Sequence, residues 1–306
     1  MIVYRPADGQ SPAIRNENIH FPLGRQLKNT NAILKEWKKI EMKKSKIERI
    51  TIYSNSLDKE MSVLVYLPKD YNENDYFPTL YFHHGKSGDE NILTDADIHI
   101  TADRLIENQQ INSLIIVCPN LENSRGLNSS SACKEVKDPL GRVINIGRYE
   151  DYFINEVIPV IDNKFKTIKN RNNRFIGGAS AGGYTALHNA FRHPDLFSKV
   201  GGHMPALELK LEEEDKAYFQ CQGNWDKYDP VKIAQQMNCV DFKVYLDAGD
   251  NDAGEFYEGC SILNKILKEK GIDSQNHVFE GHHDIEYIKS NLEKYMIFYG
   301  NTKPNA

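Results

Sequence analysis

The sequence lacks the features that mark membrane, exported and nucleic-acid-binding proteins. No window approaches the ~18 consecutive apolar residues that span a bilayer. The start, MIVYRPADGQ, lacks the basic beginning and the apolar stretch of a signal peptide. With 38 lysines and arginines against 43 acids, the net charge of -5 leaves no basic excess for phosphate contacts. We expect a cytoplasmic protein that binds neither nucleic acid nor membrane.

Cysteine is scarce, and two glycine-rich motifs are missing. The five cysteines are an odd number, and none stands in a CxxC pair. This pattern favours free thiols in a reducing compartment. The chain also has no GxGxxG and no GxxxxGK[ST], the motifs that bind dinucleotides and nucleotide phosphates. We therefore expect no dinucleotide or nucleotide site, and no other cofactor is expected.

The domain organisation is expected to be simple. Of the 306 residues, 40% are hydrophobic and 10% aromatic, which allows a sizeable core. Residues 1–45 form a polar lead-in, and the mixed-charge run at 35–49 is interpreted as a solvated helix or linker. No repeat or Gly/Ser linker marks a second boundary, so one domain is predicted over residues 46–300, with a tail at 301–306. The oligomeric state stays open.

Strand and helix patterns alternate along the predicted domain. Two β-rich runs, 49–54 and 61–67, are typical of an antiparallel hairpin. Later apolar runs between helical patterns are typical of parallel strands buried on both faces. The runs are 78–82, 114–118, 174–177, 199–202, 243–246 and 277–279, and the clearest helices are 149–165, 181–192 and 254–270. The predicted class is α/β, with a mostly parallel central sheet, an N-terminal antiparallel hairpin and helices on both faces.

Two long stretches show no clear periodicity. Residues 119–148 follow the carboxyl end of a strand, where a long loop is typical of a pocket wall. The charged insertion 208–216 fits either a lid or a solvated helix, and we favour the helix. Whether 119–148 or 208–230 acts as a lid is left open.

The most informative segment is RFIGGASAGGYTAL, which contains GxSxG between an apolar strand and a helix. This context bends the chain sharply at Ser180 and exposes its hydroxyl. Gly178 and Gly182 stand where a side chain would collide with the other arm of the turn. The amide of Ala181, at the helix N-terminus, can stabilise negative charge on an attacked carbonyl oxygen. The alternative is a glycine-rich turn whose serine only caps the helix.

A nucleophilic serine needs a base and an orienting carboxylate, which in this arrangement follow in the order Ser, Asp/Glu, His. The strand end KVYLDAGDND supplies the acids. We rank Asp252 first, because it reaches furthest over the carboxyl edge of the sheet, and Asp250 second. The segment HVFEGHHD supplies His282 and His283, between which the residues alone barely choose. A metal site at His282, His283 and Asp284 lacks HExxH or comparable spacing, so no metal is expected.

A second oxyanion donor is expected in the loop after an earlier strand. The segment PTLYFHHGKSG ends a strand at His84 and Gly85, where glycine lets the backbone approach a substrate oxygen. The backbone amide of Lys86 is the predicted donor. Of His83 and His84, one is expected to point into the core and the other to brace the loop. We count His84 and Gly85 among the substrate-binding residues.

Together these motifs resemble the esterase branch of the α/β-hydrolase superfamily, which includes esterase D-like enzymes, tributyrin esterases, carbohydrate esterases of family one and mycolyltransferases. The resemblance covers about residues 46–299 and includes SVLVYLPKDY, YEDYFINEVIPVID, LDAGDND and GHHD. The family's Gly-x-His-Asp ending implies His283 as the base and leaves His282 as a pocket-wall residue. Its acid, three residues after the strand-end glycine, implies Asp252. A Trp followed by Asp-Pro implies that Trp225 flanks the site.

The resemblance implies a serine ester hydrolase. Ser180 would form an acyl-enzyme on a small acyl ester, such as an ester of a sugar, and water would resolve it. Ala181 stands where the family often has Met, which is expected to widen the pocket. The strand end HHG departs from the S-formylglutathione hydrolase pattern. Two alternatives stay open: acyl transfer to a sugar or lipid alcohol, and a non-catalytic binding module on the same fold.

Overall fold

The computed structural model describes residues 44–301, except 220 and 239. By its internal contacts the chain divides into two units, Met1–Lys43 and Lys44–Ala306. The predicted lead-in therefore lies, apart from its last two residues, outside the described residues. The tail lies outside them as well, apart from Asn301.

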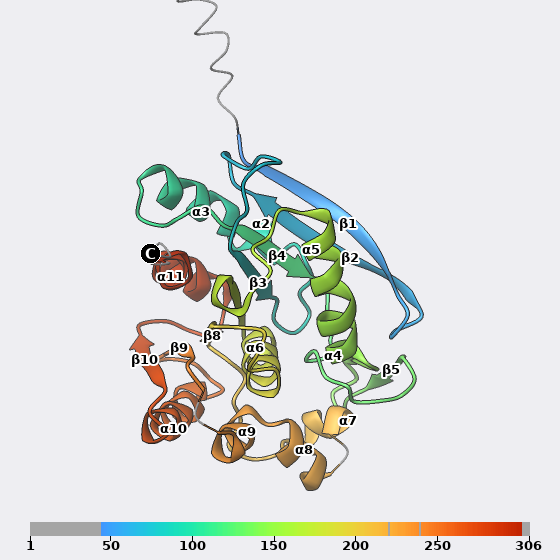
Figure 1. The fold of residues 1–306 in the computed structure, drawn as a ribbon. Helices are drawn as coiled ribbons and strands as arrows, with labels where there is room; N and C mark the ends of the chain where they lie inside the picture. Colours follow the sequence, from blue (N-terminus) through green and yellow to red (C-terminus); the bar gives the residue numbers. More distant parts are fainter. Residues whose placement is uncertain (1–43, 220, 239, 302–306) are drawn as a thin grey trace, which may run out of the picture. The chain divides into compact units, whose positions relative to one another are not determined.

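In the described part of the chain, eight strands form one sheet in the order β1-β2-β4-β3-β7-β8-β9-β10 (Figure 1). The strands are β1 (Lys46–Ser54), β2 (Lys59–Leu67), β3 (Thr79–His83), β4 (Ile115–Pro119), β7 (Arg174–Ala179), β8 (Lys199–His203), β9 (Lys243–Gly249) and β10 (Asp273–Phe279). β2 pairs antiparallel with β1 and with β4, and the other neighbouring pairs are parallel. The predicted α/β class, hairpin and mostly parallel sheet are confirmed.

Strand β1 shows that the expectation for the mixed-charge run 35–49 is wrong for its last residues, 46–49. The run 35–49 was expected to be a helix or linker, but β1 already begins at Lys46. Its side chains alternate, with Ile50 and Ile52 buried and Thr51 and Tyr53 exposed. Alternation of this kind places one face of the hairpin on the core, so the charges at the end of the run are carried by a half-buried strand.

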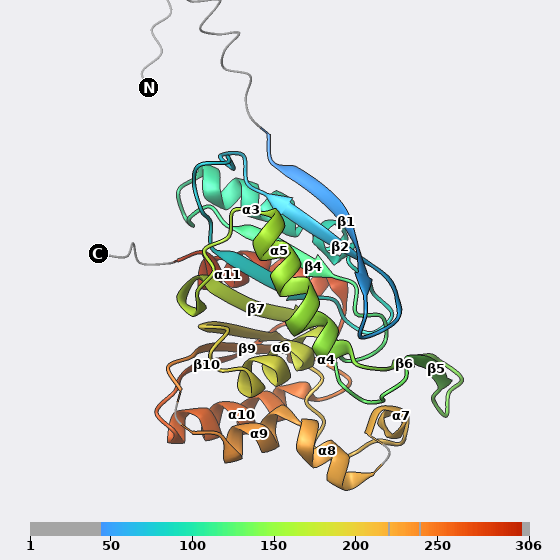
Figure 2. The same cartoon turned by 45° about the vertical axis from the view of Figure 1, so that its right-hand side comes forward.

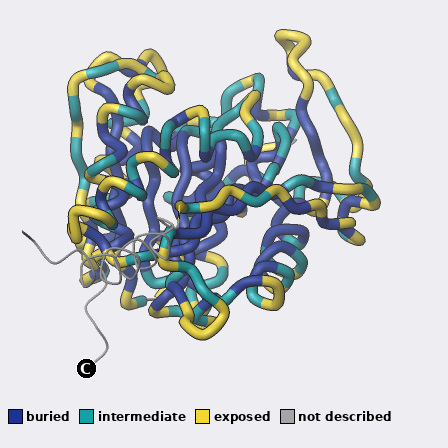
Figure 3. Tube along the Cα trace, turned by 90° about the horizontal axis from the view of Figure 1, so that it is seen from above, coloured by how far each residue is buried: buried dark blue, intermediate teal, exposed yellow. Residues whose placement is uncertain are grey.

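Helices cover both faces of the sheet, as predicted (Figures 1 and 2). One face carries α4 (Tyr149–Asp151), η1 (Tyr152–Val157), α5 (Ile158–Lys164), α6 (Ala181–Arg192), α9 (Pro230–Gln236) and α10 (Phe256–Glu269). The other carries α2 (Ile92–Asp95), α3 (Ile98–Glu107) and α11 (Ile285–Gly300). Along β3, Tyr81 packs into the first core, whereas Leu80 and Phe82 pack into the second. The central strands are consequently buried on both sides (Figure 3).

The helix predicted over residues 149–165 is continuous but not uniform. Its middle turn, η1, is a π-helix. Pro159 stands at the start of α5. Proline has no N–H and its ring crowds the carbonyl four residues earlier, so a wider turn before it relieves the conflict. Periodicity of the apolar residues does not reveal such a local change.

The two irregular stretches differ from expectation in opposite directions, the first with more regular structure and the second with less. Residues 119–148 include a hairpin formed by β5 (Lys134–Lys137) and β6 (Val143–Ile146), so the prediction of a stretch without regular elements is wrong there. The charged insertion forms only the 3-10 turn η3 (Glu213–Asp215) and the short α7 (Lys216–Phe219), followed by α8 (Gln222–Tyr228). A solvated helix is also wrong for Glu208 and Asp215, whose side chains are 12% and 2% exposed.

Candidate active site

The parallel strands bring their carboxyl ends to one edge of the sheet, and the candidate residues follow those ends. Ser180 stands between β7 and α6 with φ 55° and ψ -118°. Its backbone N–H donates to the carbonyl of His203 on β8 at 3.0 Å. Its own carbonyl accepts hydrogen bonds from the amides of Tyr184 and Ala206. These bonds hold a backbone conformation that residues other than glycine rarely adopt.

The two glycines of the motif are required by space, but only Gly178 for the predicted reason, because Gly182 faces the end of β3 and not the other arm of the turn. A Cβ at Gly178 would lie 2.5 Å from the backbone carbon of Gly182. A Cβ at Gly182 would lie 2.3 Å from the carbonyl oxygen of His83. Both contacts are with backbone and cannot be relieved by rotating a side chain. Glycine at 178 therefore lets β7 and α6 meet closely at Ser180, and glycine at 182 lets the start of α6 approach the end of β3.

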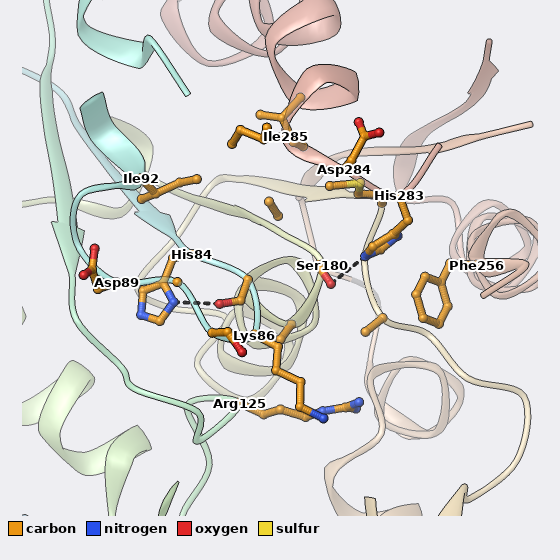
Figure 4. Close-up of a pocket in the computed structure, with 18 of the residues that line it drawn as sticks. His84, Lys86, Asp89, Ile92, Arg125, Ser180, Phe256, His283, Asp284 and Ile285 are labelled. Atoms are coloured by element: carbon orange, nitrogen blue, oxygen red, sulfur yellow. Dashed lines mark hydrogen bonds between the residues drawn. The ribbon is translucent and has the colours of Figure 1, made fainter. Parts of the chain in front are cut away.

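Ser180, His283 and Asp252 form one hydrogen-bonded chain (Figure 4). His283 Nε2 lies 2.7 Å from Ser180 Oγ, and His283 Nδ1 lies 2.8 Å from Asp252 Oδ2. The second oxygen of Asp252 accepts the amide of Gly254 at 2.9 Å. A carboxylate facing Nδ1 keeps the proton on that nitrogen and leaves Nε2 free to accept the serine proton. Asp250, the second-ranked acid, instead accepts the amide of Gly281 at 3.0 Å.

The imidazole of His283 is held from two further directions. Asp284, the next residue, caps α11 by accepting the amide of Tyr287 at 2.9 Å. The ring of Phe256 stands edge-on to the His283 ring, with 5.1 Å between centroids. The loop between β10 and α11 is thus anchored immediately after the histidine, which limits how far the ring can turn.

The loop after β3 is braced by His84, and this brace orients the amide of Lys86. His84 Nδ1 donates to the carbonyl of Gly85 at 2.8 Å, and its Nε2 accepts the amide of Leu121 at 3.0 Å. Burial lowers the pKa of His84, which favours the neutral ring that has one donor and one acceptor. In a trans peptide the N–H points away from the C=O, so fixing the Gly85 carbonyl turns the Lys86 N–H the other way.

The close approach of this loop to the serine also explains its glycine. A Cβ at Gly85 would lie 3.3 Å from Ser180 Cβ. His83, by contrast, is fully buried, and its ring stands edge-on to Phe153 at 4.7 Å between centroids. Burial lowers the pKa of His83 to about 3. The prediction that one of the two histidines points into the core and the other braces the loop is confirmed.

A cavity of about 690 Å³ opens over Ser180, within the usual size range of small-ligand sites. Its lining includes both apolar and charged side chains. Figure 4 shows Ile92 and Ile285 on one side of Ser180, and Lys86 and Arg125 on the opposite side. Ala181, predicted to widen the pocket, is among the lining residues.

Two predicted substrate-binding residues do not line this cavity, and those predictions are wrong. Trp225 lies in α8, is 5% exposed and packs into the core. His282 is exposed, and its Nδ1 donates to the carbonyl of Asn251 at 3.2 Å. The aromatic side chain at the cavity is Phe256 instead. Its position at the start of α10 places it beside His283, a relation that the sequence order does not reveal.

Arg125 is a residue of the cavity that the sequence did not predict. This residue lies in the loop after β4, with φ 53°, and lines the cavity. Its guanidinium contacts Glu208 and Asp215 of the charged insertion. The SRG tripeptide predicts a turn. No local pattern identifies the residues that pair with Arg125, because they stand more than eighty residues away in the chain.

Among residues 44–219, 221–238 and 240–301, no group of three or more His, Cys, Asp or Glu could hold a metal ion. Within the same ranges, no helix has both the length and the apolar character needed to cross a bilayer. The cytoplasmic location stays a prediction.

Known proteins resemble this chain in sequence and fold. A family model described as "Putative esterase" matches residues 54–299. An endo-1,4-beta-xylanase/feruloyl esterase of Xylanibacter ruminicola is 27% identical over 237 residues, which are 72% of this chain and 31% of that protein. This chain thus spans about a third of the length of that relative. The expected resemblance to the esterase branch is confirmed.

Solved structures share the fold. A ferulic acid esterase has a TM-score of 0.72 at 23% identity, covering 84% of this chain and 98% of its own. The fluorophosphonate-binding serine hydrolase F of Staphylococcus aureus has a TM-score of 0.68 at 20% identity, covering 85% of this chain and 100% of its own. These matches confirm the predicted α/β-hydrolase architecture.

Proposed function

Because the chain belongs to the Esterase family, we propose that it hydrolyses carboxylic esters through a covalent acyl-enzyme on Ser180. The observation that carries the proposal is the chain of two short hydrogen bonds, 2.7 Å from Ser180 to His283 and 2.8 Å from His283 to Asp252. A serine hydroxyl becomes a strong nucleophile only when a base takes its proton as it attacks. The non-catalytic alternative gives no reason for this geometry beside a cavity.

In the first half of the reaction, Ser180 Oγ attacks the acyl carbon and His283 Nε2 takes the hydroxyl proton. The carbonyl oxygen gains negative charge, which the amides of Lys86 and Ala181 stabilise. Neither amide has a hydrogen-bond partner within the described residues, so both are free to donate to an oxyanion. His283 then protonates the leaving alcohol, and the carboxylate of Asp252 stabilises the imidazolium in the interval.

In the second half, water replaces the alcohol. His283 takes a proton from the water as it attacks the acyl carbon, and the same two amides stabilise the second oxyanion. Ser180 leaves with the proton from His283, which restores the free enzyme. Removal of one oxyanion donor typically costs 10² to 10³ in rate, so the two amides supply a large share of the acceleration.

For the substrate, we infer a small acyl ester of a sugar. Support comes from the feruloyl and ferulic acid esterase names of two relatives and from a cavity of about 690 Å³ whose lining includes apolar and charged groups. An apolar surface suits an acyl chain or ring, whereas charged groups suit hydroxyls. A panel of acetyl, butyryl and feruloyl sugar esters would identify the acyl group, and added alcohol acceptors would reveal acyl transfer.

The replacement Ser180→Ala tests the nucleophile. We expect turnover of a 4-nitrophenyl ester to fall by at least ~10⁴ with the melting temperature maintained, because only the attacking oxygen is removed. A fluorophosphonate probe should label the parent and not the variant. Ser198→Ala, a half-buried serine just before β8, is the matched control and should keep full labelling. Unchanged turnover in Ser180→Ala would refute the proposal.

A further inference from the structure

One wall of the cavity is built from a segment that has little regular structure. Residues 206–219 contain only the 3-10 turn η3 and the one-turn helix α7. Three of these residues, Ala206, Glu208 and Glu214, line the cavity. A segment without a strand ladder or a long helix depends on side-chain contacts for its position.

Arg125 makes the central contacts of this kind. Its Nη2 lies 2.6 Å from Glu208 Oε1, and its Nη1 lies 3.2 Å from Glu208 Oε2, a two-pronged pairing. The same Nη2 lies 2.9 Å from Asp215 Oδ1. The three side chains are 6%, 12% and 2% exposed. One buried cation therefore pairs with two carboxylates of the wall.

Aromatic rings and a glycine fix Arg125 itself. Its guanidinium lies 5.0 Å from the ring centre of Tyr184 in α6 and 5.5 Å from that of Tyr218 in α7. A Cβ at the next residue, Gly126, would lie 2.3 Å from a methyl group of Thr185 in α6. The loop that carries Arg125 is thus pressed against the helix that follows Ser180, and the arginine lies between that helix and the wall.

Two further tethers connect the wall to residues 119–148. The Tyr218 hydroxyl donates to the carbonyl of Asn123 at 2.8 Å. Glu214 pairs with Arg142, which also pairs with Asp138 at 2.6 Å. Arg142 is 41% exposed, so water screens its pairs more than it screens those of Arg125. The two irregular stretches of the sequence are therefore held to each other, with Arg125 as their most buried link.

We propose that Arg125 is a specificity-determining residue, because it holds residues 206–219 as a fixed wall and so limits the size of the ester that the cavity accepts. This inference rests on the proposed esterase function. Without Arg125, two buried carboxylates would lose the cation that pairs with both of them. A buried charge that loses its partner is costly, and the chain relieves that cost by moving the charges into water. Glu208 and Asp215 then draw the wall outward, and the cavity lengthens at this end.

The test compares small and bulky esters in three variants. Arg125→Met removes the charge and keeps an apolar side chain of similar reach. Arg125→Lys keeps the charge but cannot pair two-pronged with Glu208. The matched control is Arg174→Met, which breaks another buried arginine pair, with Asp162 at 2.7 Å, at the opposite end of β7 from Ser180. Each variant is assayed on 4-nitrophenyl acetate, butyrate and octanoate, and on methyl and 1-naphthyl acetate.

We expect Arg125→Met to raise the bulky-to-small ratio of kcat/KM about tenfold in at least one of the two series, within the range by which pocket size discriminates substrates. Arg125→Lys should show a smaller rise, and Arg174→Met should keep the parent ratio. Parent-like ratios in both series for Arg125→Met would overturn the inference, and so would an equal rise in Arg174→Met.

Hydrogen exchange tests the wall without any ester. The amides of 206–219 should exchange faster in Arg125→Met than in the parent, whereas β7 should be unaffected. If the parent turns over no ester, the proposed function fails, and the exchange measurement still decides whether Arg125 holds the wall. Unchanged exchange in this segment would overturn the inference independently of activity.

Discussion

Two histidine–aspartate pairs lie at the carboxyl ends of strands, and only one of them reaches the cavity. His283 Nδ1 lies 2.8 Å from Asp252, and His203 Nδ1 lies 3.0 Å from Asp247. The His283 side chain is 25% exposed, whereas that of His203 is fully buried. The two pairs are nearly identical as chemical groups. They differ in what the second ring nitrogen can reach.

The second nitrogen of His203 faces a tyrosine rather than a serine. Its Nε2 lies 3.0 Å from the Tyr299 hydroxyl. The ring of Tyr295 stacks on the imidazole at 3.6 Å between centroids, and Phe82 stacks near it at 5.8 Å. No substrate atom can approach a ring enclosed in this way. Access to the cavity, and not the pairing itself, therefore separates a candidate catalytic pair from a structural one.

The buried pair nevertheless supports the exposed one. Asp247 accepts the hydroxyls of Tyr287 and Tyr295 at 2.8 and 2.6 Å, and both tyrosines belong to α11. The carbonyl of His203 accepts the amide of Ser180. The cluster thus lies directly behind the strand ends that carry the candidate triad, and it fixes the helix that begins just after His283.

Replacing each aspartate in turn with asparagine should give the largest difference between the two pairs. Asp252→Asn is expected to lower kcat by ~10⁴ with little change in stability, because the ring of His283 then adopts the wrong tautomer. Asp247→Asn should instead lower the free energy of unfolding by about 1–3 kcal/mol, since its tyrosine hydroxyls lose a buried charged acceptor. Ester kinetics and urea denaturation measure the two effects. Equal losses of kcat in both folded variants would contradict the distinction.

Removing single tyrosine hydroxyls tests whether the buried pair positions His283. Tyr287→Phe and Tyr295→Phe each remove one donor to the same oxygen of Asp247, so both should lower stability by about 1 kcal/mol. Tyr287 stands four residues after His283, and its loss should lower kcat about tenfold with KM unchanged, through misplacement of the imidazole. Tyr295→Phe is the matched control and should change kcat less. Identical kcat values would show that Asp247 does not position His283.

A third histidine, His83, provides a comparison that depends on pH. His83 has neither an aspartate nor any other hydrogen-bond partner among the described residues, and burial lowers its pKa to about 3. Between pH 6.5 and 3 the unfolded chain binds a proton that the native ring does not, so stability falls as the pH falls through this window. His83→Leu removes this dependence. Relative to the parent, the variant should gain about 2 kcal/mol between pH 7 and pH 5. A difference that does not vary with pH would contradict this account.

Much of the candidate site follows from local patterns. Gly178 is needed because two arms of one turn, adjacent in the sequence, meet there, whereas Gly182 is needed because the distant end of β3 passes close to it. Helix α6 has the predicted bounds because both of its ends are signalled locally, by the bend at Ser180 and by Pro194. Asp252 was ranked first from its distance past a strand end, and the choice of His283 over His282 came from the family resemblance. The structure brings these two residues together with Ser180.

The parts that were missed or wrong depend on packing between distant segments. Trp225 was placed at the site by a motif, but the side chain beside His283 belongs to Phe256. Arg125 and Glu208 are 83 residues apart, and the insertion that carries Glu208 has a composition typical of a solvated surface. Nothing in a run of acids indicates that one arginine elsewhere will bury two of them.

The sequence by itself determined the alternation of strands and helices, the bend at Ser180 and the order of the reactive residues. These depend on hydrophobic periodicity and on steric limits between neighbours in the chain. Only the tertiary structure decided which aspartate–histidine pair faces the cavity and which is enclosed by tyrosines. That outcome depends on how helices pack on the sheet, because packing determines which side chains water and substrate can reach.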